Sequence, residues 1–141
     1  MDLKELLGKK GESRCLVQEE NTAERFASGT VPVFGTPALV GLMEQAALNV
    51  VSSHIPDGQT TVGTGIELKH LAPTPIGMTV RAVATLVEVD GRRLLFRVEA
   101  FDECEKVGEA VHERYIVDLE RFLKKASSKV RSEQTRCSGA R

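Results

Sequence analysis

The 141-residue sequence contains no tryptophan, and only 4% of its residues are aromatic. A hydrophobic core must therefore be built mainly from Val, Leu, Ile and Ala. Its three cysteines, Cys15, Cys104 and Cys137, are odd in number and form no C-x-x-C pair. This argues against a disulfide framework and against a zinc site, so we expect reduced thiols and a cytoplasmic protein.

Long hydrophobic runs are also missing from the sequence. No apolar stretch reaches the roughly 20 residues that span a bilayer. Residues 1–12 contain no apolar segment typical of a secretory signal. We therefore expect a protein that does not contact the membrane, and a chain of this length fits a single domain.

The net charge is only -1, but the charge is distributed unevenly. Residues 124–141 carry six basic side chains and one acidic side chain, with no apolar periodicity. We interpret 124–141 as a disordered tail whose charge is solvated. We do not expect it to bind nucleic acid or a membrane, although a basic segment can do either.

An apolar stretch at residues 34–54 is the central feature of the sequence, and we predict that it forms one helix. Thr36 suits the N-cap and Pro37 the first helical position, while a proline and a glycine follow the predicted end. Because nearly every face is apolar, we expect the fold to enclose this helix. Glu44 lies in its middle, and a buried carboxylate needs a partner.

The remaining pattern is extended, and we predict strands at residues 13–19, 60–71, 78–89, 94–101 and 107–119. The pair Asp90-Gly91 is a strong hairpin signal. One apolar helix among such strands predicts an α+β arrangement, the hotdog fold, in which an antiparallel sheet wraps around one long central helix. We assign residues 1–12 to a lead-in and 13–123 to this domain. An open sheet edge favours pairing with a second subunit.

The stretch 60–71 contains two glycines, Gly63 and Gly65, that alternation places on one strand face. The other face is expected to carry Val62, Thr64, Ile66, Leu68 and His70. Glycines inside a strand often mark a bulge or a close approach of the backbone to another group. We expect one of these two features here.

Seven short motifs occur in order along the chain. They are Val33-Phe34-Gly35-Thr36, Val40-Gly41-Leu42-Met43-Glu44, Val62-Gly63-Thr64, Lys69-His70, Pro73-Thr74-Pro75-Ile76-Gly77, Gly91-Arg92-Arg93-Leu94 and His112-Glu113-Arg114. Together they resemble the fluoroacetyl-CoA thioesterase family of hotdog proteins over roughly residues 13–123. The resemblance implies a homodimer or higher oligomer that hydrolyses short acyl-CoA thioesters without a metal or cofactor, coenzyme A being part of the substrate.

The resemblance also implies site residues. Thr36, Glu44 and His70 match the catalytic positions of the family, and Gly63 and Arg114 match positions that contact the substrate. Phe34 is expected to shape the substrate pocket.

Residues 22–32, before the helix, could act as a lid over that pocket, although an ordinary surface connection is the commoner case. This segment is shorter than the lid of the fluoroacetyl-specific enzyme, and Phe26 is its one aromatic residue. The resemblance therefore supports thioesterase chemistry better than it supports fluoroacetyl-CoA as the substrate.

Each catalytic candidate has a structural interpretation beside the functional one. Glu44 could act as general base or nucleophile, or form an ion pair with Arg114 or Lys69. Thr36 could be only a helix cap. His70 could donate a proton to the departing thiolate or polarise the carbonyl, or be an ordinary hydrogen-bonded residue.

Glu44 lies eight positions after Thr36, which corresponds to about 12 Å along the helix axis. They cannot touch within one chain, so we predict a site that draws residues from both subunits. We interpret His112 as structural. A non-catalytic acyl-CoA binding module and a hotdog hydratase or dehydratase are the alternative functions.

Overall fold

The structure, a computed structural model, describes residues 2–130. Its longer elements are β1 (Lys10–Leu16), α1 (Thr36–Val51), β2 (Gln59–His70), β3 (Thr79–Asp90), β4 (Arg93–Phe101), β5 (Lys106–Asp118) and α2 (Leu119–Ser127). Short 3-10 turns occur at η1 (Leu3–Leu6), η2 (Glu19–Asn21), η3 (Ser52–His54) and η4 (Ser128–Val130). The five strands form one antiparallel sheet in the order β1-β3-β4-β5-β2.

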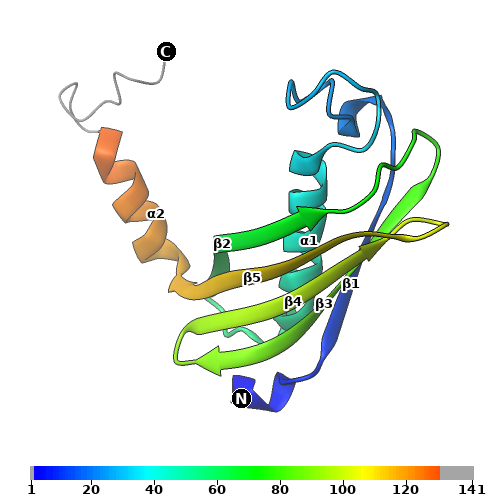
Figure 1. The fold of residues 1–141 in the computed structure, drawn as a ribbon. Helices are drawn as coiled ribbons and strands as arrows, with labels where there is room; N and C mark the ends of the chain where they lie inside the picture. Colours follow the sequence, from blue (N-terminus) through cyan, green and yellow to red (C-terminus); the bar gives the residue numbers. More distant parts are fainter. Residues whose placement is uncertain (1, 131–141) are drawn as a thin grey trace.

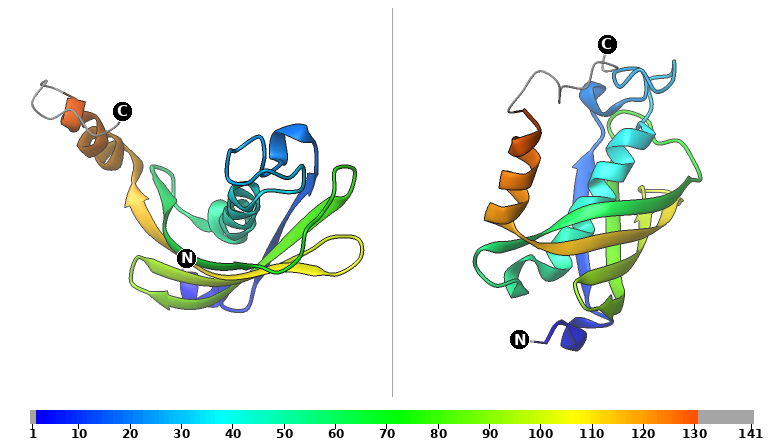
Figure 2. Two further views of the ribbon diagram at one scale, coloured as in Figure 1. Left: turned by 45° about the horizontal axis from the view of Figure 1, so that its top comes forward. Right: turned by 90° about the vertical axis from the view of Figure 1, so that its left-hand side faces the viewer.

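The sheet curls around α1, as the views in Figures 1 and 2 show. Alternate residues of β3 and β4 are buried, and they face the apolar side of the helix. Strand β1 comes closest, because a Cβ atom on Gly11 would lie 2.5 Å from the carbonyl oxygen of Ala46. The predicted hotdog fold is confirmed.

The sheet covers only one side of α1. Seven residues of the helix are buried: Leu39, Leu42, Met43, Ala46, Ala47, Val50 and Val51. On the other side Gly41 and Gln45 are exposed, and Glu44 is partly exposed. The expectation that the fold encloses the helix is therefore wrong for a single chain, because no described element packs over this second side.

The helix start also differs from the prediction. Gly35 is the N-cap residue, and Thr36 is already the first helical residue. A Cβ atom on Gly35 would lie 2.9 Å from the backbone nitrogen of Ala23, so only glycine fits this packed turn. The hydroxyl of Thr36 therefore does not cap the helix and can bond to another side chain.

Strand β2 contains the irregularity that its glycines predict. Its pairing with β5 shifts register between Gly63, opposite Arg114, and Gly65, opposite Glu113. The extra residue, Thr64, inverts the alternation of side chains beyond it. The bulge, one of the two features that the glycines predicted, is confirmed, but the common face predicted for residues 62, 64, 66, 68 and 70 is wrong.

The C-terminal part of the described chain is helical. Helix α2 includes residues 124–127, and η4 continues to Val130, so the expected disorder of 124–141 is wrong for these residues. In the first part of α2, helical spacing places Leu119, Phe122 and Leu123 on one side of the helix. Residues 131–141 lie outside the described range, and at the other end β1 begins at Lys10 rather than at 13.

Helix α2 projects from the curved sheet (Figures 1 and 2) and has no buried residue. Within residues 2–130 no helix is both long enough and apolar enough to cross a membrane.

Candidate active site

The first group of predicted site residues lies where α1 begins and β2 ends. Thr36 Oγ1 and His70 Nδ1 are 2.9 Å apart and form a hydrogen bond. The other ring nitrogen of His70, Nε2, is buried and has no hydrogen-bond partner among the described residues. Burial lowers the pKa of His70 below its ordinary value. The ring is therefore neutral near pH 7 and keeps one nitrogen free for a substrate group.

A depression of about 360 Å³ surrounds this pair. Phe34, Thr36 and His70 line it together with residues of the preceding loop, including Ala23 and Ser28. Backbone hydrogen bonds from Ala23 to Val33 and from Glu24 to Val31 close the base of this loop. The segment 22–32 thus forms one wall of the depression, where a lid would lie. The side chain of Phe26 is 46% exposed and does not line the depression.

The second group lies in the middle of α1 and β2. Arg114 Nη1 is 3.8 Å from Glu44 Oε2, and the side chain of Glu44 is 40% exposed whereas that of Arg114 is 8% exposed. A Cβ atom on Gly63 would lie 2.5 Å from the same carboxylate oxygen. Glycine at this position therefore makes room for the carboxylate, and Arg114 supplies a nearby positive charge.

Each of the three guanidinium nitrogens of Arg114 has a hydrogen-bond partner. Its Nε donates to Thr61 Oγ1 and its Nη2 donates to the Thr61 carbonyl, both at 2.9 Å. Its Nη1 lies 3.2 Å from His112 Nε2. Burial lowers the pKa of Arg114, and Glu44 opposes this effect, but a guanidinium remains charged in proteins.

His112 also belongs to this second group, although the sequence pattern suggested only a structural role for it. Only 1% of the residue is exposed, and its Nδ1 is 2.8 Å from the Gly65 carbonyl. Burial lowers the pKa of His112, with an opposing effect of the Gly65 bond and a further lowering by Arg114. Its position two residues before Arg114, on the same strand face, is the signal that could have identified it.

The structure thus gathers the six predicted residues into two groups. Phe34, Thr36 and His70 form one group, and Glu44, Gly63 and Arg114 form the other. About 12 Å of helix separates Thr36 from Glu44. Of the two ion-pair partners considered for Glu44, Arg114 is the one found.

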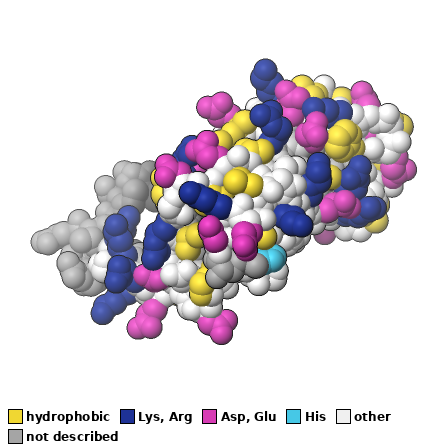
Figure 3. Space-filling view, turned by 90° about the horizontal axis from the view of Figure 1, so that it is seen from below, with side chains coloured by type: hydrophobic (Ala, Val, Ile, Leu, Met, Phe, Trp, Pro, Cys, Tyr) yellow, Lys and Arg dark blue, Asp and Glu magenta, His cyan; other side chains and the backbone are white. Residues whose placement is uncertain are grey.

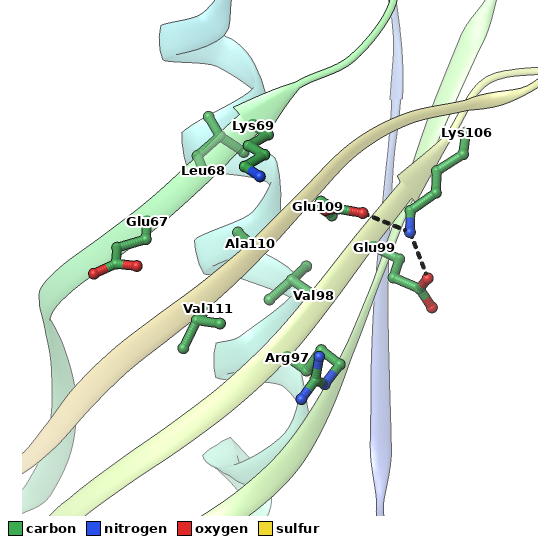
Figure 4. A pocket seen from close by; sticks show the side chains of 10 residues that line it. All are labelled: Glu67, Leu68, Lys69, Arg97, Val98, Glu99, Lys106, Glu109, Ala110 and Val111. Atoms are coloured by element: carbon green, nitrogen blue, oxygen red, sulfur yellow. Dashed lines mark ion pairs between the residues drawn. The ribbon is translucent and has the colours of Figure 1, made fainter.

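Lys69 lies instead on the outer face of the sheet, in another depression (Figure 4). There Lys106 Nζ lies 2.9 Å from both Glu99 and Glu109, so charges neutralise one another. Acidic and basic side chains also intermingle over the face in Figure 3. Within residues 2–130, no group of three His, Cys, Asp or Glu side chains could hold a metal ion.

Comparison with known proteins decides the family. The sequence profile of the fluoroacetyl-CoA-specific thioesterases matches residues 17–120. The chain belongs to this family. A fluoroacetyl-CoA thioesterase of Streptantibioticus cattleyicolor is 41% identical to it over 97 residues, which cover 69% of this chain and 70% of that protein.

Solved structures agree with the family assignment. The fluoroacetyl-CoA thioesterase FlK matches with a TM-score of 0.83 and 33% identity, covering 87% of this chain and 96% of FlK. A mutant of FlK in complex with fluoroacetate and CoA matches with a TM-score of 0.78 and 34% identity, over 82% of this chain and 98% of that one. A thioesterase superfamily member of Thermus thermophilus matches with a TM-score of 0.82 and 28% identity, over 90% and 96% of the two chains.

Proposed function

We propose that the protein hydrolyses a short-chain acyl-CoA thioester to the free acid and coenzyme A. Membership in the thioesterase family gives the reaction class. The observation that carries the proposal is the setting of Glu44. Its carboxylate lies on a partly open side of an apolar helix, beside Arg114 and in the space that Gly63 leaves.

Two routes are open to this carboxylate. As general base, Glu44 takes a proton from the water that attacks the thioester carbonyl. As nucleophile, it attacks the carbonyl itself, and water then hydrolyses the resulting anhydride. In both routes the charge of Arg114 stabilises negative charge in the site.

The Thr36–His70 pair is suited to act on the thioester carbonyl or on the departing thiolate. If the Thr36 hydroxyl donates to Nδ1 of the neutral ring, the proton of His70 is on Nε2, the nitrogen without a partner. That N–H can polarise the thioester carbonyl or protonate the departing thiolate. Free backbone N–H groups at the start of α1 add positive potential near the same place.

We further propose a homodimer that completes the site. Strand β2 is an edge of the sheet, and one side of α1 is uncovered. A second copy paired at this edge would bring the Thr36–His70 pair of one chain towards the Glu44–Arg114 pair of the other. The 12 Å separation within one chain supports this arrangement. Cys15 and Cys104 are free thiols, which fits the reducing cytoplasm.

The test is a panel of acyl-CoAs from acetyl to octanoyl, with fluoroacetyl-CoA included, in which a thiol reagent detects free coenzyme A. We expect thiol release that is fastest with the short acyl groups. Glu44→Gln should lower kcat by about 10²–10⁴-fold. Glu67→Gln is the matched control, because Glu67 lies on the outer face of the sheet.

Two results would contradict the proposal. Hydration or dehydration of an enoyl or hydroxyacyl chain without thiol release would identify a hydratase or dehydratase. Thermal stabilisation by acyl-CoA without turnover would identify a binding module.

A further inference from the structure

The two hydrogen-bond partners of His112 determine the chemical form of its ring. The Gly65 carbonyl, 2.8 Å from Nδ1, can only accept a hydrogen bond, so Nδ1 must carry a proton. The Arg114 guanidinium, 3.2 Å from Nε2, can only donate, so Nε2 must present its lone pair. His112 is therefore neutral, with its proton on Nδ1.

We propose that His112 is a positioning residue that holds Arg114 in place beside the Glu44 carboxylate; this rests on the proposed function. The Nη1 group of Arg114 has two hydrogens. When one is directed at His112, the other remains on the side of Glu44, 3.8 Å away. Without an acceptor at His112, only the two bonds to Thr61 would orient the guanidinium.

The bulge in β2 makes this arrangement possible. Gly65 is the first paired residue after the register shift, and its carbonyl reaches the inner face of the sheet, where His112 is buried. The ring of Phe96 packs beside the imidazole, with centroids 6.3 Å apart. The charged groups around the ring are Arg114 on the same strand, Glu44 of α1 and the neighbouring Glu113.

Two substitutions separate the two hydrogen bonds of His112. In His112→Asn the amide nitrogen is near the position of Nδ1, so the variant keeps the bond to Gly65 and loses the acceptor for Arg114. In His112→Gln the amide oxygen reaches the position of Nε2 and restores that acceptor. His54→Asn is the matched control, because His54 lies on η3, outside both groups.

We expect His112→Asn to lower kcat for acyl-CoA hydrolysis by about 10–100-fold with little change in KM. His112→Gln should recover most of kcat, because its amide oxygen restores the acceptor for Arg114. Thermal unfolding of each variant checks that the fold persists. Equal kcat values in the His112→Asn and His112→Gln variants would overturn the proposal.

A second measurement does not depend on activity. Imidazole nitrogen chemical shifts, assigned with the His54 and His112 variants, report the tautomer of each histidine. We expect His112 to keep its proton on Nδ1 at pH 7. A proton on Nε2 would overturn the proposal. A wild-type protein that shows this tautomer but releases no thiol would contradict the proposed function alone.

Discussion

At the scale of single residues, the site depends on neutral histidines with defined partners. His70 bonds to Thr36 through one nitrogen and leaves the other free. His112 uses both nitrogens, one for the Gly65 carbonyl and one for Arg114. The two rings therefore suit different tasks, since only His70 has a nitrogen available to a substrate.

These buried rings predict how stability depends on pH. An unfolded histidine takes up a proton near pH 6.5, whereas burial lowers the pKa of both His70 and His112 in the fold. The unfolded state then binds more protons below about pH 6.5, so stability falls as the pH falls through this range.

The slope can reach about 1.4 kcal/mol per pH unit for each proton. Urea unfolding between pH 7.5 and 5 should show a smaller loss for His112→Gln than for wild type, with His54→Asn as control. Identical slopes in wild type and His112→Gln would contradict this expectation.

The ion pair of Glu44 with Arg114 could be predicted from the sequence, whereas the roles of the site residues stay predictions. Glu44 stands out because a carboxylate interrupts an apolar helix, and Arg114 was one of its two proposed partners. His112 did not stand out, because a lone histidine in an alternating strand usually has a structural role. Capping propensity alone assigned Thr36 to the N-cap, since the tight packing that requires glycine at position 35 comes from the distant residue Ala23.

At the scale of elements, β2 carries residues of both groups, and its Gly63 lies beside the Glu44 side chain of α1. A Cβ atom there would lie 2.5 Å from the end of the flexible Glu44 side chain, which can move away, and 3.2 Å from Cε1 of His112, which would have to shift slightly. The fold can therefore accept a larger residue at position 63, but the Glu44 carboxylate cannot then keep its position.

Gly63→Ala should thus lower kcat by about 10–100-fold while changing the free energy of unfolding by less than about 1 kcal/mol. Gly65→Ala is the matched control, because nothing lies within 4 Å of its added Cβ atom. Steady-state kinetics and urea unfolding of both variants check this. Equal activity of the two variants would contradict it.

Periodicity predicted α1 and the five strands, because long apolar patterns dominate their sequences. The short helix α2 was missed at residues 124–127. These four residues, two lysines, an alanine and a serine, resemble a solvated tail, and no buried side chain marks the helix as part of the fold. The uncovered side of α1 was also missed, since an apolar pattern does not reveal whether its cover comes from the same chain or from a second one.

At the scale of the whole molecule, one chain holds the candidate site residues in two separate groups. The proposed homodimer would combine them, and coexpression of two inactive variants tests this. If Thr36 and Glu44 of one site come from different chains, a dimer of Thr36→Ala with Glu44→Gln has one intact site.

Random assortment should then restore about a quarter of wild-type activity, because roughly half of the dimers are mixed and each has one of two sites intact. Size-exclusion chromatography establishes the dimer, and thiol release measures the activity. Two Glu44→Gln chains with different tags serve as the control. No recovery above the parent variants would contradict a shared site.

The single extra residue in β2 has a consequence for the whole molecule. Thr61 and Gly63 face α1 before it, while His70 faces the same side after it, although odd and even positions of a regular strand face opposite ways. In β2 the residues that face α1 therefore have odd numbers before Thr64 and even numbers after it. An insertion or deletion of one residue between Ile66 and His70 would turn the histidine away from Thr36 and leave Gly65 and the surroundings of Glu44 unchanged, so the two halves of the site can change independently.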